Sequence, residues 1–287
     1  MTSTIAIVGA GRVGRALGRK LHDLGWTVSS VVARSESSAR SAVRVIGGGR
    51  PQHKLTRRVL DAEVVLIATP DDAIGGVAAK LAQIGGEEWR GRIVIHMSGA
   101  LDNTALEPLA HAGAATASMH PLQTFGGRGA PPLAGVAFVI QGHRRAQAAA
   151  RKIARALGGV PIALRPSAKP AYHAAGAFVS GYLLALVETG IQILTRLGFS
   201  RRRARMALLP LIHQTLSNFE RFGARATWTG PISRGDYATV SRHMRSLAAW
   251  PREFEQAYAA LARISARVLA VRPKQTLQQL NRVLSKR

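Results

Sequence analysis

A glycine-rich string near the start of the chain has the spacing that binds the phosphates of a dinucleotide. It follows the apolar run 5–8, which predicts a strand, and it precedes a helical stretch over residues 12–24. In this context the first glycine permits a tight turn, the second lets the backbone approach the pyrophosphate, and the third allows close helix packing. The N–H groups that open the helix then face the phosphates. The string consists of Gly9, Ala10, Gly11, Arg12, Val13 and Gly14.

The residues about 20 positions further on bear on which dinucleotide the site prefers. A site for NAD has an Asp or Glu there for the ribose 2′-hydroxyl, whereas Arg34 and Ser35 follow the strand expected over 27–33. A guanidinium and a hydroxyl can bind a 2′-phosphate, which an acid would repel. We therefore expect NADP as the cofactor. Thr69 and Pro70 follow another apolar run and would border the cofactor, although capping of the next helix is an alternative role.

Two histidines and a serine stand where a redox reaction could use them. Ser98 follows the strand expected over 93–97, and His120 follows the one over 116–119. Ligands of doubly wound folds bind at the carboxyl ends of the strands, so both side chains would lie near a nicotinamide ring. The imidazole suits proton transfer near neutral pH, and the hydroxyl would hydrogen-bond the same substrate atom. His173 opens a long apolar helix and is the second candidate; a structural role is the alternative for each histidine.

A turn in the last third of the chain offers groups that could bind an acidic substrate. The string TGPISRGD covers residues 229–236. Arg234 could clamp a substrate carboxylate through two hydrogen bonds. Asp236 is a second candidate, but we favour its role as the N-cap of the helix that follows. Thr229 and Lys169 complete the candidates for contact with the substrate.

The patterns of strands and helices divide the chain near residue 165. Before it, β-branched runs alternate with helical stretches, which predicts a doubly wound α/β domain with a mostly parallel sheet over residues 1–165. After it the strand signals stop, which predicts an all-α domain over residues 166–287. Further strands are expected over 63–68, 136–141 and 160–164. Helices are expected over 71–83, 103–112, 144–157, 170–197, 200–221, 236–250, 251–271 and 274–285.

The composition excludes several classes of protein. The 287 residues contain no Cys, which excludes disulfides, thiolate chemistry and zinc fingers, and we expect no metal. Lys and Arg number 40 against 15 Asp and Glu, a net charge of +25 that could attract a polyanion. However, aromatic residues make up 5% and no recognition motif is present, so we do not expect nucleic acid as a partner.

The apolar run 174–187 bears on location and assembly. Its 14 residues fall short of the ~18–20 that a membrane span needs, and no signal segment is recognisable. We therefore expect a soluble, cytoplasmic protein without a membrane partner. A helix that is apolar all round must be covered on all sides, which a domain of about 120 residues can hardly do alone. This favours a homodimer formed through the helical domain.

Three strings together resemble a known family. HPLQTF at 120–125, YHAA at 172–175 and TGPISRGD at 229–236, with Thr239 and His243 downstream, resemble the family that joins a Rossmann-like domain to the domain of unknown function DUF2520. That family is similar to the 6-phosphogluconate dehydrogenase-like group, which includes pyrroline-5-carboxylate reductases and prephenate dehydrogenases. The resemblance implies an NADP-binding domain, then a helical dimerisation domain of the 6-phosphogluconate dehydrogenase C-terminal-like type, with the active site in the cleft between them.

The resemblance to prephenate dehydrogenases implies roles for individual residues. Those enzymes use a Ser, a His-Pro motif and a further His, which match Ser98, His120 and His173, and their Arg in the second domain has its counterpart in Arg234. The chain departs from the pattern because Leu-Gln-Thr-Phe follows His-Pro, so prephenate is not the expected substrate. Gly181 stands where the family is expected to have Asn.

These observations favour an NADP-dependent oxidoreductase. We expect it to transfer a hydride between NADP(H) and a small, carboxylated substrate of the hydroxy/keto or amine/imine type. One alternative is a non-catalytic NADP-binding sensor or assembly protein, which would bind NADPH without oxidising it. The other, less favoured, is a basic protein that binds polyanions, with an affinity that falls steeply with salt.

Overall fold

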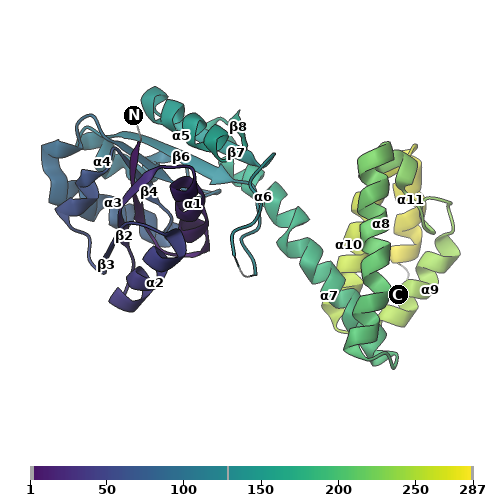
Figure 1. Cartoon of the computed structure of the whole chain (residues 1–287). Coiled ribbons are helices and arrows are strands. Elements are labelled where there is room, and N and C mark those ends of the chain that lie inside the picture. The colour runs from purple at the N-terminus through teal and green to yellow at the C-terminus, as the bar shows by residue number, and fades with distance from the viewer. Residues whose placement is uncertain (1–2, 128, 286–287) are drawn as a thin grey trace. The chain divides into compact units, whose positions relative to one another are not determined.

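The computed structural model describes residues 3–127 and 129–285. Its contacts divide the chain into two compact units, Met1–Gly181 and Tyr182–Arg287 (Figure 1). The sequence pattern predicts a boundary near residue 165. The division falls later because the helix that follows residue 168 contacts the sheet of the first unit through Lys169 and Tyr172.

Eight strands form one sheet in the described part of the first unit. Their order is β3-β2-β1-β4-β5-β6-β7-β8, and neighbours pair in parallel except β6 and β7, which are antiparallel. This confirms the doubly wound, mostly parallel sheet. The strands are β1 Thr4–Val8, β2 Thr27–Val32, β3 Arg50–Gln52, β4 Val64–Ile67, β5 Ile93–His96, β6 Ala115–Pro121, β7 Ala137–Gly142 and β8 Val160–Ala163.

Helices cover both faces of the sheet, which explains why its central strands are continuously apolar. α1, α2 and α5 pack on one face together with side chains such as Ile5 and Leu66, and α3 and α4 pack on the other with Ala6 and Val65. The helices are α1 Arg12–Asp23, α2 Glu36–Ile46, α3 Asp71–Gly85, α4 Glu107–His111, α5 Arg144–Ala156 and α6 Lys169–Val179. Short 3₁₀ segments are η1 Arg57–Asp61, η2 Gly86–Trp89, η3 Asn103–Leu106 and η4 Pro166–Ala168.

The second unit is helical, as the pattern after residue 165 predicts. A small apolar core joins α9, α10 and α11 through Val240, Ala262, Ala266 and Leu280. The helix expected over 170–197 is broken at Ser180, whose backbone leaves the helical region (φ −122°, ψ −81°). The helices are α7 Gly181–Arg196, α8 Arg201–Thr227, α9 Tyr237–Leu247, α10 Arg252–Leu269 and α11 Pro273–Leu284.

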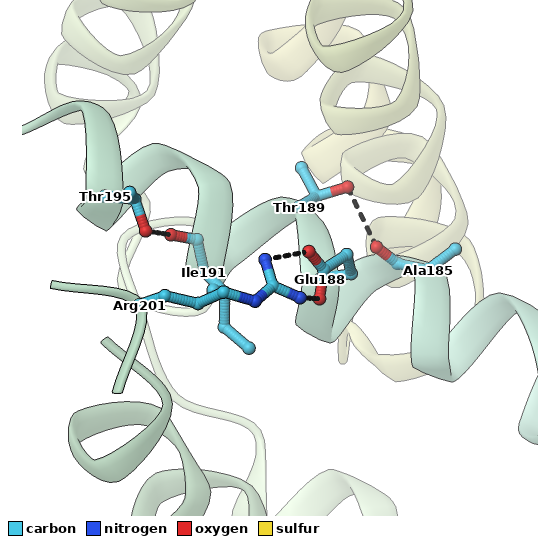
Figure 2. Close-up of polar contacts among 6 residues, drawn as sticks. All are labelled: Ala185, Glu188, Thr189, Ile191, Thr195 and Arg201. Atoms are coloured by element: carbon cyan, nitrogen blue, oxygen red, sulfur yellow. Dashed lines mark hydrogen bonds and ion pairs between the residues drawn. The ribbon is translucent and has the colours of Figure 1, made fainter. Parts of the chain in front are cut away.

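Polar side chains on α7 are satisfied close to the helix itself. Arg201 binds both carboxylate oxygens of Glu188, at 2.6 and 2.9 Å, and these bonds lower the pKa of Glu188 (Figure 2). The hydroxyls of Thr189 and Thr195 donate to the carbonyls of Ala185 and Ile191 in the preceding turn. The helix therefore presents mainly apolar side chains to its surroundings.

By length and composition, the helical stretch Pro166–Arg196 is able to cross a membrane. Its 18-residue window has a mean hydropathy of 1.6, and 6% of that window is buried. This differs from the sequence expectation, which rests on the 14 most apolar residues alone. A single helix of this kind is weak evidence for a membrane protein.

Candidate active site

The glycine turn after β1 has the shape that its sequence predicts. Gly9 has a φ of +105°, and a Cβ there would lie 2.5 Å from the carbonyl carbon of Ala68. At Gly14 a Cβ would lie 2.1 Å from the oxygen of Gly9, so both positions require glycine. Gly11 differs, because its nearest neighbour, the oxygen of Ala68, would be 4.0 Å away. The space beside Gly11 is therefore open to a ligand that approaches the backbone.

A groove of about 410 Å³, which we call the dinucleotide groove, runs along this turn. Several predicted cofactor residues line it: Gly9, Ala10, Gly11, Arg34, Thr69 and Pro70. Ser35 does not, because its hydroxyl caps α2 by accepting from the N–H of Ser38 at 3.2 Å. Arg12 and Gly14 belong to the turn without lining the groove, and Val13 lines the cavity described below.

The groove is also lined by three polar side chains that the sequence pattern does not single out: Arg15, Ser38 and His53. Ser38 lies one helical turn after Ser35, the N-cap of α2. A prediction of this helix from the sequence would therefore have placed Ser38 beside the cofactor residues Arg34 and Ser35. Within the described residues no acidic side chain lines the groove, which leaves it free of the carboxylate typical of NAD sites.

The groove fits a dinucleotide by two further observations. The Oγ1 atom of Thr69 is buried and has no hydrogen-bond partner among the described residues. Burying a hydroxyl without a hydrogen bond costs free energy, and a hydrogen bond to a ligand or water would offset that cost. At the start of α1, Gly11 supplies no side-chain cap, so the first N–H groups of the helix remain available for phosphate.

A second hollow of about 360 Å³ adjoins the groove, and we call it the histidine cavity. It shares Ala68 and Thr69 with the dinucleotide groove. All of its lining belongs to the first unit and comes from strand ends and the loops that follow them, the N-termini of α1 and α3, and the start of α6. The lining is Val13, Ala68, Thr69, Asp71, Met97, Ser98, Gly99, His120, Pro121, Gln123, Phe125 and His173.

His120 and His173 direct ring nitrogens at the same point in this cavity. A Cβ on Gly99 would lie 2.5 Å from Nδ1 of His173 and 2.9 Å from Nε2 of His120. The two rings are perpendicular, with centroids 5.8 Å apart. The absence of a side chain at Gly99 thus allows both imidazoles to pack closely against the turn that carries it.

His120 is held from its other side by Tyr172, which the sequence pattern does not single out as a site residue. The Nδ1 atom of His120 lies 2.7 Å from the hydroxyl of Tyr172. Burial lowers the pKa of His120 to about 4, assisted by the charges of Lys169 and His173 and opposed by Asp71. Burial also raises the pKa of Tyr172 to about 12. At neutral pH the pair therefore consists of a neutral imidazole and an intact phenol.

Ser98 has its hydrogen-bonding capacity in use within the protein. Its hydroxyl donates to Asp71 at 2.8 Å and accepts from the N–H groups of Ala100 and Leu101, at 3.1 and 2.9 Å. A serine hydroxyl offers one donor and two lone pairs, so no capacity remains in this arrangement. The structure therefore gives Ser98 a role in shaping the turn, and its contact with substrate stays a prediction.

Lys169 has a different place from the one expected of a substrate-binding residue. Its side chain is 1% exposed and lines neither hollow. The ammonium donates to the carbonyl of Ser98 at 2.8 Å and to the hydroxyl of Ser118 at 2.9 Å. Burial lowers its pKa to about 8, against the attraction of Asp102 and Asp71. Lys169 therefore connects the start of α6 to the turn after β5 and to the middle of β6.

The remaining candidates lie in the second unit. Asp236 caps α9, because its carboxylate accepts from the N–H of Thr239 at 3.0 Å and from its hydroxyl at 2.7 Å. These bonds lower the pKa of Asp236. Thr229 and Arg234 are exposed on the turn before α9. Binding of substrate by any of the three stays a prediction.

Family models match most of the chain. Residues 2–121 match the Rossmann-like domain, and residues 136–264 match the domain of unknown function DUF2520. The chain belongs to the family that joins these two domains. No curated protein matches the sequence.

Several solved structures are similar to this family member along nearly its whole length. A candidate NADP oxidoreductase from Bacteroides fragilis is 18% identical with a TM-score of 0.74, covering 96% of this chain and 98% of that one. An imine reductase from Streptomyces aurantiacus is 16% identical (TM-score 0.64; 99% and 100% covered). A pyrroline carboxylate reductase from Plasmodium falciparum with NADP bound is 12% identical (TM-score 0.61; 99% and 98% covered). At these identities the likeness shows the fold alone.

Proposed function

We propose that this protein is an NADP-dependent oxidoreductase. It transfers a hydride between NADP(H) and a small, carboxylated substrate of the hydroxy/keto or amine/imine type. The observation that carries the proposal is that Ala68 and Thr69 line both the dinucleotide groove and the histidine cavity. The groove that fits a dinucleotide thus adjoins two imidazoles suited to proton transfer.

The preference for NADP over NAD rests on the end of the groove that follows β2. Arg34 and Ser38 line it there and offer a guanidinium and a hydroxyl to a 2′-phosphate. His53, which follows the neighbouring strand β3, lines the same groove. The names of two of the similar structures, which mention NADP, agree with this preference.

NADP(H), when bound, supplies or accepts the hydride. Reduction of a C=O or C=N bond adds that hydride to carbon and a proton to the heteroatom, and oxidation removes both. His120 and His173 are the groups that would hold or accept this proton, because both line the histidine cavity. Asp71, Ser98 and Lys169 shape the turn that carries Gly99. Arg234 remains the proposed partner of a substrate carboxylate, by resemblance.

A second part of the proposal concerns assembly as a homodimer through the helical unit. Large apolar side chains on α7 and α8 are exposed in the single chain, for example Leu184, Leu211 and Phe219. Within this surface the carboxylate of Glu188 on α7 is paired with Arg201. A second copy would cover this surface. Replacing Leu184 and Leu211 by Glu should yield monomers in sedimentation, whereas Gln278→Glu on α11 should not.

Binding and turnover test the proposed function separately. The dissociation constant for NADPH, measured by fluorescence, should be lower than that for NADH, and Arg34→Ala should reduce this preference for NADPH by about tenfold or more. Tighter binding of NADH would overturn the cofactor assignment. A panel of keto acids, hydroxy acids and cyclic imines then tests catalysis. NADPH binding without turnover of any of them would favour the non-catalytic sensor instead.

A further inference from the structure

We propose that Tyr172 is a positioning residue that fixes the tautomer of His120. In the tautomer it selects, His120 carries its proton on Nε2 and presents it to the histidine cavity. The consequence for the substrate rests on the proposed function, but the tautomer itself can be measured without any reaction.

The contact between the two residues is well defined. The hydroxyl of Tyr172 lies 2.7 Å from Nδ1 of His120, and the rings meet edge to face with centroids 5.6 Å apart. Tyr172 and His173 lie three and four residues after the buried Lys169 on α6, so all three occupy one face of that helix. The anchoring of Lys169 to Ser98 and Ser118 therefore also holds Tyr172 against His120.

Two arrangements of protons are possible in a bond between a neutral imidazole and a phenol. Either the phenol donates to Nδ1, or Nδ1–H donates to the phenol oxygen. In the second arrangement the phenolic proton needs a further acceptor, and among the described residues Tyr172 has a hydrogen bond only to His120. The first arrangement satisfies both groups with one bond. It leaves the proton of His120 on Nε2.

The direction of Nε2 gives this tautomer a consequence. This atom and Nδ1 of His173 lie against Gly99, and both rings line the histidine cavity together with that glycine. A neutral N–H there hydrogen-bonds a lone pair and can polarise a carbonyl group. Carbonyl and hydroxyl oxygens have lone pairs to offer, as does the nitrogen of a neutral imine, whereas a protonated iminium or an ammonium has none. Of the substrates proposed above, the site therefore favours those that present a lone pair over the protonated nitrogen forms.

Nitrogen NMR of the full chain tests the tautomer directly. Protein labelled with ¹⁵N at histidine is examined at pH 7, and His120→Gln assigns the His120 signals by their loss. We expect the wild-type protein to show a protonated Nε2 and an unprotonated Nδ1 on His120. In Tyr172→Phe we expect a mixture in which Nδ1–H is populated. A wild-type ring protonated on Nδ1 overturns the proposal, as does a tautomer that is the same in Tyr172→Phe.

The chain contains a matched control pair in its second unit. Nδ1 of His243 lies 2.9 Å from the hydroxyl of Tyr258, with the same edge-to-face geometry. Tyr258→Phe should change the signals of His243 and leave those of His120 as in the wild type. A change at His120 in this control would mean that the Tyr172→Phe effect is not local, which contradicts the proposal.

The outcome is distinguishable from failure of the proposed function. Should Tyr172→Phe lose its circular dichroism spectrum and fail to fold, the wild-type tautomer alone still decides the question. A protein with Nε2–H on His120 that never oxidises NADPH would support the proposed tautomer and contradict the proposed oxidoreductase function. An active enzyme with Nδ1–H on His120 would support the oxidoreductase function and contradict the proposed tautomer.

Discussion

Lys169 donates a 2.8 Å hydrogen bond to the carbonyl oxygen of Ser98, so a buried ammonium holds the turn that follows β5. The arrangement has an energetic cost, because a charge that is 1% exposed has lost most of its hydration. The pKa of Lys169, lowered to about 8, expresses that cost. The same turn carries Gly99, so the shape of the histidine cavity depends on this lysine.

The free energy of unfolding should therefore depend on pH through Lys169. The pKa of Lys169 is about 8 when folded, against an ordinary value of 10.5, so between these values the unfolded chain binds more protons. Stability of the wild type relative to Lys169→Met should then rise with pH, by up to about 3 kcal/mol between pH 8 and 10.5. Urea denaturation of both proteins at several pH values measures this difference. Lys80→Met, which removes an exposed lysine of α3, sets the baseline. A difference that stays constant with pH would contradict the burial of a charged lysine.

Gly99→Ala should disrupt the histidine cavity. The added methyl group would meet Nδ1 of His173 at 2.5 Å and Nε2 of His120 at 2.9 Å, so at least one ring must move. We expect a loss of turnover of about 100-fold or more, while the dissociation constant for NADPH stays within about threefold, because displaced catalytic groups affect the chemical step. Gly76→Ala is the control, since its Cβ would have no neighbour within 4 Å and it lies in helix α3. Equal effects of the two variants would contradict the prediction.

Gly11→Ala and Gly14→Ala should fail in different ways. A Cβ on Gly11 meets only the oxygen of Ala68, at 4.0 Å, so the protein should fold with nearly unchanged stability. The methyl group would occupy the space for the pyrophosphate, and NADPH affinity should fall by about tenfold or more. A Cβ on Gly14 would lie 2.1 Å from the oxygen of Gly9, so this variant should lose stability by several kcal/mol. Thermal unfolding and NADPH titration of both variants distinguish the two effects. Unchanged NADPH binding by Gly11→Ala would contradict the cofactor site.

The fold was largely predictable because its buried strands have continuous apolar sequences. β4 and β5 are buried along their whole length, and their runs of Val, Ile and Leu predict this burial. β3 was not predictable, because it has three residues, Arg50, Pro51 and Gln52, and no apolar pattern. β3 forms because its backbone pairs with β2 at the edge of the sheet. Local propensity carries no information about such a strand.

The candidate site was predictable in part for a similar reason. Ser98 follows β5 and His120 lies near the carboxyl end of β6. The carboxyl ends of parallel strands meet at one edge, so the structure brings these residues together as the topology requires. The contact between His120 and Tyr172 joins residues 52 positions apart and depends on how α6 folds back on the sheet. The hydrogen bond that the Ser98 hydroxyl donates likewise depends on a distant residue, Asp71, which comes after another strand. Such long-range pairs leave no signal in the local sequence.

His96 should make the protein sensitive to acid. Its side chain is fully buried, its Nε2 lies 2.8 Å from the carbonyl of Asp102, and its Nδ1 accepts from the N–H of Ser98 at 3.2 Å. Burial lowers the pKa of His96 from 6.5 to about 4, so between these values the unfolded chain binds a proton that the folded chain does not. Stability is therefore fully present above pH 6.5 and is lost as the pH falls towards 4, by up to about 3 kcal/mol.

The variant His96→Asn isolates this contribution, because asparagine keeps an oxygen that can accept from the N–H of Ser98 but binds no proton. The free energy of unfolding of the wild type should exceed that of His96→Asn at pH 7 and approach or fall below it at pH 4.5. His120 is also buried with a pKa near 4, but it is present in both proteins and cancels in the difference. His111→Asn, at an exposed position of α4, provides the baseline for loss of a histidine. A difference between wild type and His96→Asn that is the same at both pH values would mean that folding does not change the pKa of His96. His96 would then be protonated in the folded protein at pH 4.5, and the N–H of Ser98 would need another partner there.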